Sequence, residues 1–391
     1  MEDKIRKDFP MLDSNIVYFD NASTSLKPNE VIKSVEDFYT KHTSNAYRGS
    51  YINSELISLK IDECRELVAT MINSSSREVI FTSGCTDSIN QLVKMLNIKK
   101  KDNVVCSLLE HHSNYLPWLN SSNLTVVGLD KNGVIDLKEL ESILKNNKIK
   151  IVTVTALSNV TGNVQPVKEI CKLAHKYGAL AMIDCCQYAP HFRIDVKDID
   201  CDFLALSAHK MCGPSGLGVL YGKKELLLKC NKSKYGGGMV DRIVDSTNVR
   251  YKEIPYCFEA GTPAIENILG YASAIRYYLG VGFENISKKN KELEDYFKKK
   301  IDKSKNIKMI FPISKNHAPI FTFKLNRDLN LNYVAKILSD SANICVSSGY
   351  QCCQPLYNTI GEKGGIRVSL QFYNTKKEID YFIEKIENLK I

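Results

Sequence analysis

Strand-like and helical segments alternate along this chain from about residue 50 to the C-terminus. Apolar residues at helical spacing predict a helix over residues 52–71, and a short apolar strand is expected directly after it, at residues 78–82. A second helix is predicted to start near Cys85, and further strands, separated by helical stretches, are expected at residues 104–106, 151–154 and 181–183. This alternation predicts an α/β fold with a mostly parallel sheet and helices on both faces.

The C-terminal third of the chain has a different pattern. Residues 233–262 are rich in glycine and predict a long functional loop. Two long helices are expected after this loop, at residues 263–279 and 283–302, and alternating strands and helices follow from residue 320. The predicted units are an N-terminal segment, 1–20, that packs with the small domain, a large domain, 21–262, and a small C-terminal domain, 263–391.

Composition narrows the class of protein further. The hydrophobic fraction of 44% and the charged fraction of 25% are typical of soluble globular proteins. The net charge of +9 does not indicate nucleic-acid binding, because the lysines are interleaved with glutamates on helix-like stretches and no aromatic–basic motif accompanies them. The charged N-terminus contains no signal core, and no apolar run is long enough to span a bilayer. We therefore expect a cytoplasmic protein with neither a nucleic-acid nor a membrane partner.

The chain contains thirteen cysteines, an odd number, and nothing in the sequence points to export. They are therefore expected to be free thiols in a reducing compartment. The sequence contains no C-x-x-C pair, and adjacent cysteines such as Cys185 and Cys186 rarely converge on one tetrahedral ion. No metal site is predicted.

A lysine, Lys210, occupies an unusual position near the middle of the chain. It follows the apolar, strand-like residues 203–206, and the glycines and proline of residues 213–218 prevent a helix from following it. Lys210 is therefore expected to project from a strand end into a pocket. An amine that loses its hydration there is available to form a Schiff base with an aldehyde.

The aldehyde expected at Lys210 is pyridoxal phosphate, whose ring nitrogen needs an acidic partner to act as an electron sink. Asp184 supplies this acid, because it ends a second apolar run at residues 180–183. The alternative for Lys210 is a surface lysine in a glycine loop. That alternative does not account for Asp184 or for the phosphate-binding candidates.

The phosphate-binding candidates lie between a predicted strand and a predicted helix. The segment Ser83-Gly84-Cys85-Thr86 would place a glycine turn at a helix N-terminus, where free backbone N–H groups and the helix dipole favour a phosphate. A simple N-cap by Ser83 or Thr86 is the alternative. The presence of Lys210 favours the phosphate.

Two histidines, His111 and His112, follow another predicted strand. An imidazole at that sheet edge could stack on a pyridine ring and exchange protons near neutral pH. Spacing alone does not decide which of the two faces inward, and a structural role remains open for either.

The C-terminal part of the chain contributes a cysteine and an arginine. Cys352 lies in a loop bounded by Gly349 and Pro355, and an exposed loop thiol can react. Arg367 lies on a predicted strand, where its planar fork suits a substrate carboxylate. An ordinary surface salt bridge is the alternative for Arg367.

Together these residues resemble the cysteine desulfurases, which are pyridoxal-phosphate enzymes of aminotransferase class V. The resemblance runs from residues 18–23 to residues 367–375, and its most specific parts are residues 207–210, 258–263 and 349–352. It is closest to the Suf-type, or group II, branch, which includes selenocysteine lyase-like members. It implies the PLP-dependent transferase fold of type I, with a seven-stranded sheet.

The resemblance also implies roles for individual residues. Lys210 would carry the internal aldimine, Asp184 would hold the pyridinium, and Cys352 would form a persulfide. In a homodimer, Thr262 would reach the phosphate bound by the neighbouring subunit. The remaining cofactor contacts implied are Cys85, Thr86, Ser207 and His209 around the phosphate, His111 rather than His112 on the ring, Gln187 at the phenolic oxygen, and Asn159 beside cofactor and substrate.

Five positions depart from the usual group II pattern. Ser347 replaces a common arginine, Tyr350-Gln351 replace a histidine pair, Tyr47 replaces a histidine, and Cys353 replaces an alanine. These departures leave the cofactor site intact. They leave open the preference between cysteine and selenocysteine, the reactivity of the Cys352 thiol, and whether Cys353 takes part in sulfur transfer.

The implied reaction converts L-cysteine to L-alanine and passes sulfur through Cys352 to an acceptor protein, with iron–sulfur cluster assembly as the expected pathway. Selenocysteine lysis uses the same site and remains an alternative, whereas transamination would need no reactive cysteine. A cofactor-binding scaffold without turnover is disfavoured by the joint presence of Lys210, Asp184, Arg367 and Cys352.

Overall fold

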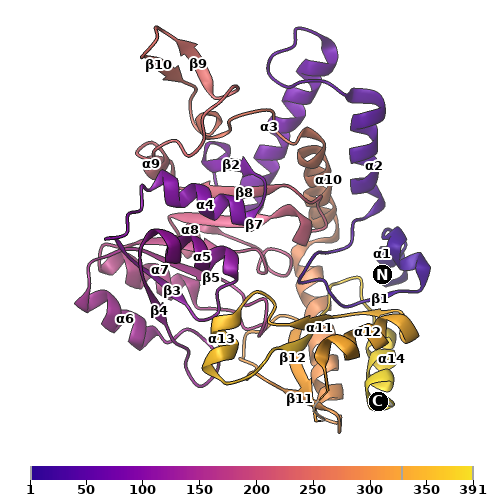
Figure 1. Cartoon of the computed structure of the whole chain (residues 1–391). Helices are drawn as coiled ribbons and strands as arrows, with labels where there is room; N and C mark the ends of the chain where they lie inside the picture. Colours follow the sequence, from indigo (N-terminus) through magenta and orange to yellow (C-terminus); the bar gives the residue numbers. More distant parts are fainter. Residues whose placement is uncertain (1, 327–328, 390–391) are drawn as a thin grey trace.

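A seven-stranded sheet forms the centre of the computed structural model, which describes residues 2–326 and 329–389 (Figure 1). Strand β8 is antiparallel to both of its neighbours, β2 and β7, and the remaining neighbours pair in parallel. The predicted α/β fold with a mostly parallel sheet is therefore confirmed. In sheet order the strands are β2 (Val79–Thr82), β8 (Gly218–Gly222), β7 (Phe203–Ser207), β6 (Leu180–Asp184), β5 (Ile149–Thr155), β3 (Asn103–Ser107) and β4 (Asn123–Val127).

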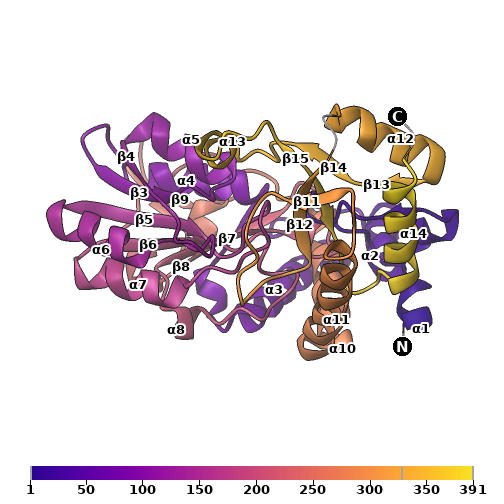
Figure 2. The same cartoon turned by 90° about the horizontal axis from the view of Figure 1, so that it is seen from below.

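Helices cover both faces of this sheet, as the view from below shows (Figure 2). Their buried side chains divide between two apolar cores, one on each face. One face is covered by α3 (Ile52–Ile72), α6 (Leu137–Asn146), α7 (Val167–Lys176) and α8 (Val196–Ile199). The other is covered by α4 (Cys85–Met95), α5 (His112–Ser121) and α9 (Lys224–Leu227).

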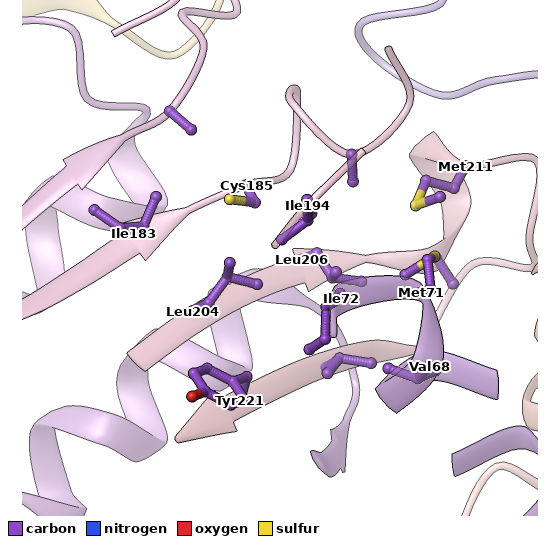
Figure 3. Packing of buried hydrophobic residues seen from close by; sticks show 14 of the residues in the cluster. Val68, Met71, Ile72, Ile183, Cys185, Ile194, Leu204, Leu206, Met211 and Tyr221 are labelled. Carbon is purple, nitrogen blue, oxygen red and sulfur yellow. The ribbon is translucent and has the colours of Figure 1, made fainter. Parts of the chain in front are cut away.

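Alternate residues of a sheet strand belong to different cores, because successive side chains of a strand point to opposite faces. In β7, Leu204 and Leu206 pack in one core while Phe203 and Ala205 pack in the other. Figure 3 shows Leu204 and Leu206 in the same cluster as Val68 of α3. The central strands thus bury both faces, which explains why their sequences are continuous apolar runs.

The C-terminal part forms a second, antiparallel sheet with its own apolar core. The N-terminal strand β1 (Val17–Tyr18) pairs in parallel with β13 (Ile344–Cys345), and Phe19 is buried in this second core. The strands are β11 (Ile307–Met309), β12 (Ile320–Leu325), β15 (Gly365–Ser369) and β14 (Ser347–Gly349), and the helices of this part are α11 (Phe283–Ile301), α12 (Leu331–Ala342), α13 (Gln354–Thr359) and α14 (Lys376–Glu387).

Helix α10 (Ile265–Val281) packs against α3 and α2 (Asn29–Asp37) on one side and leads into α11 on the other. It therefore connects the two parts of the chain. The domain boundaries remain a prediction. The other short elements are α1 (Glu2–Arg6), a π-turn at Phe38–His42, and 3₁₀ turns at Pro10–Ser14, Ser76–Glu78, Ala208–Lys210 and Tyr256–Phe258.

Residues 233–262 are more ordered than a loop. They contain a hairpin of β9 (Val240–Ile243) and β10 (Val249–Tyr251), which projects from the rest of the chain (Figure 1). Its turn is closed by the Asp245 carboxylate, which accepts hydrogen bonds from the N–H groups of Thr247 and Asn248. The hairpin escaped prediction because its strands are mostly exposed and lack an apolar face.

None of the helices in the described ranges has the length and apolarity needed to cross a membrane.

Candidate active site

A cavity of about 630 Å³ lies where the two parts of the chain meet. Its walls come from the carboxyl ends of the sheet strands, from the first turn of α4 and from the loop between β14 and α13. Ligands bind at this edge of open parallel sheets because the strands end there together. Of the residues predicted from the sequence, those lining the cavity are Cys85, Thr86, His111, Asn159, Asp184, Gln187, Ser207, His209, Lys210, Cys352 and Arg367.

Thr262 is the predicted site residue that does not line this cavity. It is exposed and lines a second cavity of about 430 Å³, together with Arg48, Lys234 and Glu259. Within a single chain, Thr262 therefore does not contact the same bound molecule as Lys210.

Lys210 ends a single 3₁₀ turn that follows β7 directly. The turn places the lysine at the strand end, half-buried against the cavity, as the sequence pattern predicts. Its amine has no hydrogen-bond or ion-pair partner in residues 2–326 and 329–389. An amine held without a protein partner is available to a ligand.

The first turn of α4 reaches the cavity beside Lys210. Its N-cap, Gly84, provides no side-chain hydrogen bond to the first helical N–H groups, and the Ser207 hydroxyl accepts a hydrogen bond of 2.9 Å from the Cys85 N–H. Gly218 allows this close packing, because a Cβ there would lie 2.5 Å from the Gly84 Cα. The Thr86 hydroxyl also lines the cavity, 2.7 Å from the Ser113 hydroxyl. The turn therefore offers N–H and hydroxyl donors to an anion.

Asp184 ends β6 at the floor of the cavity and is only 5% exposed. One carboxylate oxygen accepts a hydrogen bond of 2.9 Å from the Cys186 N–H. No cation in the described chain pairs with it. A buried carboxylate without a positive partner is costly, so this site suits a cationic group supplied by a ligand.

His111 is the N-cap of α5, and its Nδ1 accepts a hydrogen bond of 3.1 Å from the Ser113 N–H. This bond assigns the ring proton to Nε2 in the neutral imidazole. Burial, and then the positive charge of Lys210, lowers the pKa of His111 to about 3. The ring is therefore neutral at physiological pH. His112 also lines the cavity, so position alone does not separate the two histidines.

Arg367 lies on β15 and is 3% exposed, so it does not form the surface salt bridge considered from the sequence. Its guanidinium donates to the Asp20 carboxylate at 3.0 Å, to the Ser23 hydroxyl at 2.7 Å and to the Asn159 carbonyl at 3.0 Å. Its Nε is buried and has no partner in the described chain. Three of the five guanidinium N–H groups are thus used within the chain, so the side chain retains donors for a ligand.

The loop that carries Cys352 is held over the cavity by hydrogen bonds on both sides. The Cys352 carbonyl accepts from the His112 N–H at 2.8 Å, and the Asn159 amide donates to the Gln351 carbonyl at 2.8 Å. The Gln351 amide donates to the Gly365 carbonyl at 3.0 Å and accepts from the Tyr357 hydroxyl. Gln351 and Cys352 both have left-handed backbone angles, with φ of 44° and 56°. Tertiary contacts therefore hold a conformation that neither residue favours by itself.

Cys352 is exposed, and all the cysteines are free thiols. The adjacent Cys353 is fully buried, with its thiol 3.5 Å from the Leu108 carbonyl. Burial, and then the carboxylate of Glu110, raises the pKa of Cys353 to about 12. Only Cys352 of this pair is placed to react with a molecule in the cavity.

Gln187 and His209 are two further predicted residues that line the cavity. The Gln187 amide donates a hydrogen bond of 2.6 Å to the Ala22 carbonyl, which ties the N-terminal segment to the large sheet. Burial, and then Lys210, lowers the pKa of His209 to about 4. His209 is therefore a neutral donor or acceptor at physiological pH.

The residues present fit pyridoxal phosphate. The turn at α4, whose N-cap is a glycine, suits its phosphate, the unpaired carboxylate of Asp184 suits its pyridinium, and the unpartnered amine of Lys210 suits its aldehyde. Asp184 and Lys210 each lack the charged or covalent partner that the cofactor would supply.

Sequence reasoning missed several residues that shape the cavity. Ser113 links Thr86 to His111, and Asp20 and Ser23 orient Arg367. Ser113 could have been found from its position two residues after His111, where an N-cap side chain accepts from the backbone. Asp20 and Ser23 gave no such signal, because they are more than 340 residues from Arg367 in sequence.

The sequence matches the family described as aminotransferase class-V over residues 17–382. The chain belongs to the class V aminotransferase family. Two class V relatives, described as probable cysteine desulfurases, come from Halalkalibacterium halodurans and a Synechocystis strain. Both are 37% identical to this chain, over 99% and 98% of its length and 97% and 94% of theirs.

A solved structure described as an apo cysteine desulfurase from Thermococcus onnurineus superposes with a TM-score of 0.93. It is 33% identical in sequence, over 98% of this chain and 97% of that one. The comparisons confirm the family resemblance and the type I fold predicted from the sequence. They also confirm the expectation of a pyridoxal-phosphate enzyme of the cysteine desulfurase type.

Proposed function

We propose that this class V enzyme binds pyridoxal phosphate through the residues described above and converts L-cysteine to L-alanine, leaving a persulfide on Cys352. One observation carries the proposal: a single cavity holds the unpartnered Lys210 amine, the unpaired Asp184 carboxylate and the exposed Cys352 thiol. Amino-group transfer would need the first two groups but not the thiol. The names of the similar proteins support the same reading.

Pyridoxal phosphate, when bound, withdraws electrons from the α-carbon of an amino acid attached to it. Lys210 would hold the cofactor and, once released, would take the proton from the substrate α-carbon. Asp184 would keep the pyridine nitrogen protonated, and the guanidinium of Arg367, which lines the cavity, would bind the substrate carboxylate. His111, neutral at working pH, would stack on the ring without adding positive charge beside Lys210.

Cys352 would act as a thiolate on the sulfur of the substrate. The carbon–sulfur bond of cysteine breaks and a sulfur–sulfur bond to Cys352 forms. The transferred sulfur is oxidised by two electrons, and these electrons reduce the substrate β-carbon to the methyl group of alanine. Of the two thiol protons, one ends on this methyl group and the other on the persulfide. The step therefore needs no external oxidant.

The acceptor of the persulfide sulfur is proposed to be a protein thiol of the Suf type, in the service of iron–sulfur cluster assembly in the cytoplasm. The exposed position of Cys352 supports a protein acceptor, because a partner's cysteine could reach it without opening the core. The ordered loop implies that the acceptor approaches the thiol, rather than the thiol travelling to the acceptor.

A homodimer is also proposed. Three large apolar or aromatic side chains at the start of α3 and along it, Tyr51, Ile52 and Leu59, are exposed. Ile52 is 83% exposed, which is unusual for an isoleucine on a helix and supports burial against a second copy. Thr262 would then contact the phosphate bound by the neighbour. A Leu59→Lys variant that elutes as a monomer from size-exclusion chromatography would support this interface.

The experiment that tests the proposed activity follows both products of L-cysteine turnover in the presence of dithiothreitol, which releases persulfide sulfur as sulfide. Alanine and sulfide should form in equal amounts, and other amino acids should give neither. A Cys352→Ser variant should keep the visible absorbance of the bound cofactor and lose sulfide release. Cys353→Ala is the matched control and should retain both. Wild-type sulfide release by Cys352→Ser would contradict the assignment. Selenocysteine as a parallel substrate measures the preference between the two.

A further inference from the structure

Two cysteines and an aspartate converge inside the cavity although they come from two segments that are far apart in sequence. Cys85 lies in the first turn of α4, Asp184 ends β6, and Cys186 follows it in the next turn. The sulfur atoms of the cysteines and one carboxylate oxygen all lie within 4.8 Å of one another. All three residues are buried, and all three line the cavity. An ion could therefore reach them from the cavity.

The donor set matches a thiophilic divalent cation. Zinc binds thiolate sulfur at about 2.3 Å and carboxylate oxygen at about 2.0–2.2 Å in tetrahedral sites. Neighbouring ligand atoms in such a tetrahedron are about 3.3–3.8 Å apart, so no pair in this cluster has to close by more than about 1.5 Å. The fourth position would face the cavity and remain open to water or to a thiol.

The backbone and one neighbouring hydroxyl hold the three ligands in place. The Asp184 carboxylate accepts from the Cys186 N–H at 2.9 Å, and the Ser207 hydroxyl accepts from the Cys85 N–H at 2.9 Å. The same hydroxyl lies 3.7 Å from the Cys186 sulfur. Such outer contacts orient metal ligands. The negative charge of three ionised ligands exceeds that of a divalent cation by one, and the nearby amine of Lys210 can balance it.

We propose that Cys85, Asp184 and Cys186 bind one thiophilic divalent cation, such as Zn²⁺, in the cofactor-free protein, and that this ion blocks loading of pyridoxal phosphate. The metal site rests on these three side chains alone. The block rests on the proposed cofactor site, because Asp184 cannot ligate a metal and hold the pyridinium at the same time. The sequence offered no metal signal, because Cys85 and Cys186 are 101 positions apart and meet only through the sheet.

The test uses the full-length chain, stripped of cofactor, in a Cys352→Ser background that removes the exposed thiol of the cavity. Cd²⁺ is titrated while the ultraviolet absorbance of the thiolate–cadmium bond is followed, and Zn²⁺ affinity is measured by competition with a chromophoric chelator. One ion per chain is expected. Cys85→Ser and Cys186→Ala should each weaken binding by at least about 100-fold, more than the loss of an outer contact. Cys171→Ala, a buried cysteine on α7 outside the cavity, is the matched control and should bind normally.

Pyridoxal phosphate is then added to the metal-loaded and metal-free forms. The metal-loaded form should load at least about tenfold more slowly, and a chelator should restore the rate. Unchanged Cd²⁺ binding in both cysteine variants, or no saturable thiolate signal, would overturn the metal site. Normal loading with the ion bound would overturn the block alone. Failure of the metal-free form to load would instead overturn the proposed cofactor. Thermal unfolding of each variant shows whether it is folded, and the two cysteine positions test the site independently.

Discussion

Two of the buried charged groups, Arg65 and Asp184, differ in whether the protein supplies an ion-pair partner. Arg65 of α3, only 2% exposed, forms a two-bond ion pair with Glu259, at 2.6 and 2.9 Å, and also donates to the Val79 carbonyl. Asp184, 5% exposed, accepts one backbone hydrogen bond and has no ion pair in the described chain. Glu259 of this pair lines the second cavity together with Thr262, whereas Asp184 lines the cavity that holds Lys210.

The difference separates structural charges from charges kept for a ligand. A buried charge without a partner costs stability, and a folded protein tolerates it where a bound group completes the pair. Glu259 also accepts from the Phe81 N–H at 2.7 Å, so the ion pair fixes β2 against the segment before Thr262. Substitutions at the two places should therefore have opposite effects on activity and on stability.

Asp184→Asn should have the largest effect on activity. Alanine formation from L-cysteine should fall by at least about 100-fold, because a neutral amide cannot keep the pyridine nitrogen protonated. The unfolding midpoint of the cofactor-free protein should stay the same or rise, since an unpaired buried charge is removed. A marked loss of stability with activity preserved would break the comparison.

Arg65→Ala should have the opposite profile. Leaving Glu259 without its partner should lower the free energy of unfolding by about 3–5 kcal/mol, as measured by urea denaturation. The double variant Arg65→Met, Glu259→Leu should recover most of this loss, because it removes both charges. If Arg65→Ala were as stable as the wild type, the Arg65–Glu259 ion pair would not stabilise the fold, and the contrast with Asp184 would fail.

The low pKa of His111 predicts a pH dependence of stability. Its pKa falls from 6.5 in the unfolded chain to about 3 in the folded one, so only the unfolded chain binds a proton between these values. The contribution of neutral His111 is present above about pH 6.5 and is lost as the pH falls toward 3. Between neutrality and about pH 4, the free energy of unfolding of His111→Asn should fall less than that of the wild type. Urea denaturation of the two cofactor-free proteins measures this difference. An equal loss in both proteins would contradict the assigned burial.

The smallest effect is expected at the neighbouring cysteines. Iodoacetamide should modify Cys352 rapidly and Cys353 only on unfolding, because Cys353 is buried and its pKa is raised to about 12. Cys353→Ala should cost about 1 kcal/mol of stability and leave sulfide release unchanged. Mass spectrometry of the labelled protein identifies the modified residue, and a labelled Cys353 in the folded protein would show that the loop opens.

The local sequence pattern was sufficient to predict the strand ends and the turn that carry the residues of the site. Lys210 was found because an apolar strand ends just before a glycine-rich turn, and Asp184 because it ends another apolar run. The turn at Gly84 was found because glycine precedes a helical period. Each of these signals is contained within a few consecutive residues, so no knowledge of tertiary packing was needed to find it.

Long-range contacts were beyond the reach of such patterns. The burial of Arg367 depends on Asp20 and Ser23, and the opposite exposure of Cys352 and Cys353 depends on how the loop packs against α5. The roles of Thr262 and His111 came from family resemblance and remain predictions. The hairpin at residues 240–251 was missed because exposed strands lack an apolar period.

The amino-acid sequence by itself determined the alternation of strands and helices and placed a lysine, an acid and a glycine turn at strand ends, because period and turn chemistry act over a few residues. Only the tertiary structure decided which charges are paired. It brought Cys85 to Cys186, hid Cys353 and exposed Cys352, because burial and partnership depend on segments that meet only when the sheet and the C-terminal part close around one cavity.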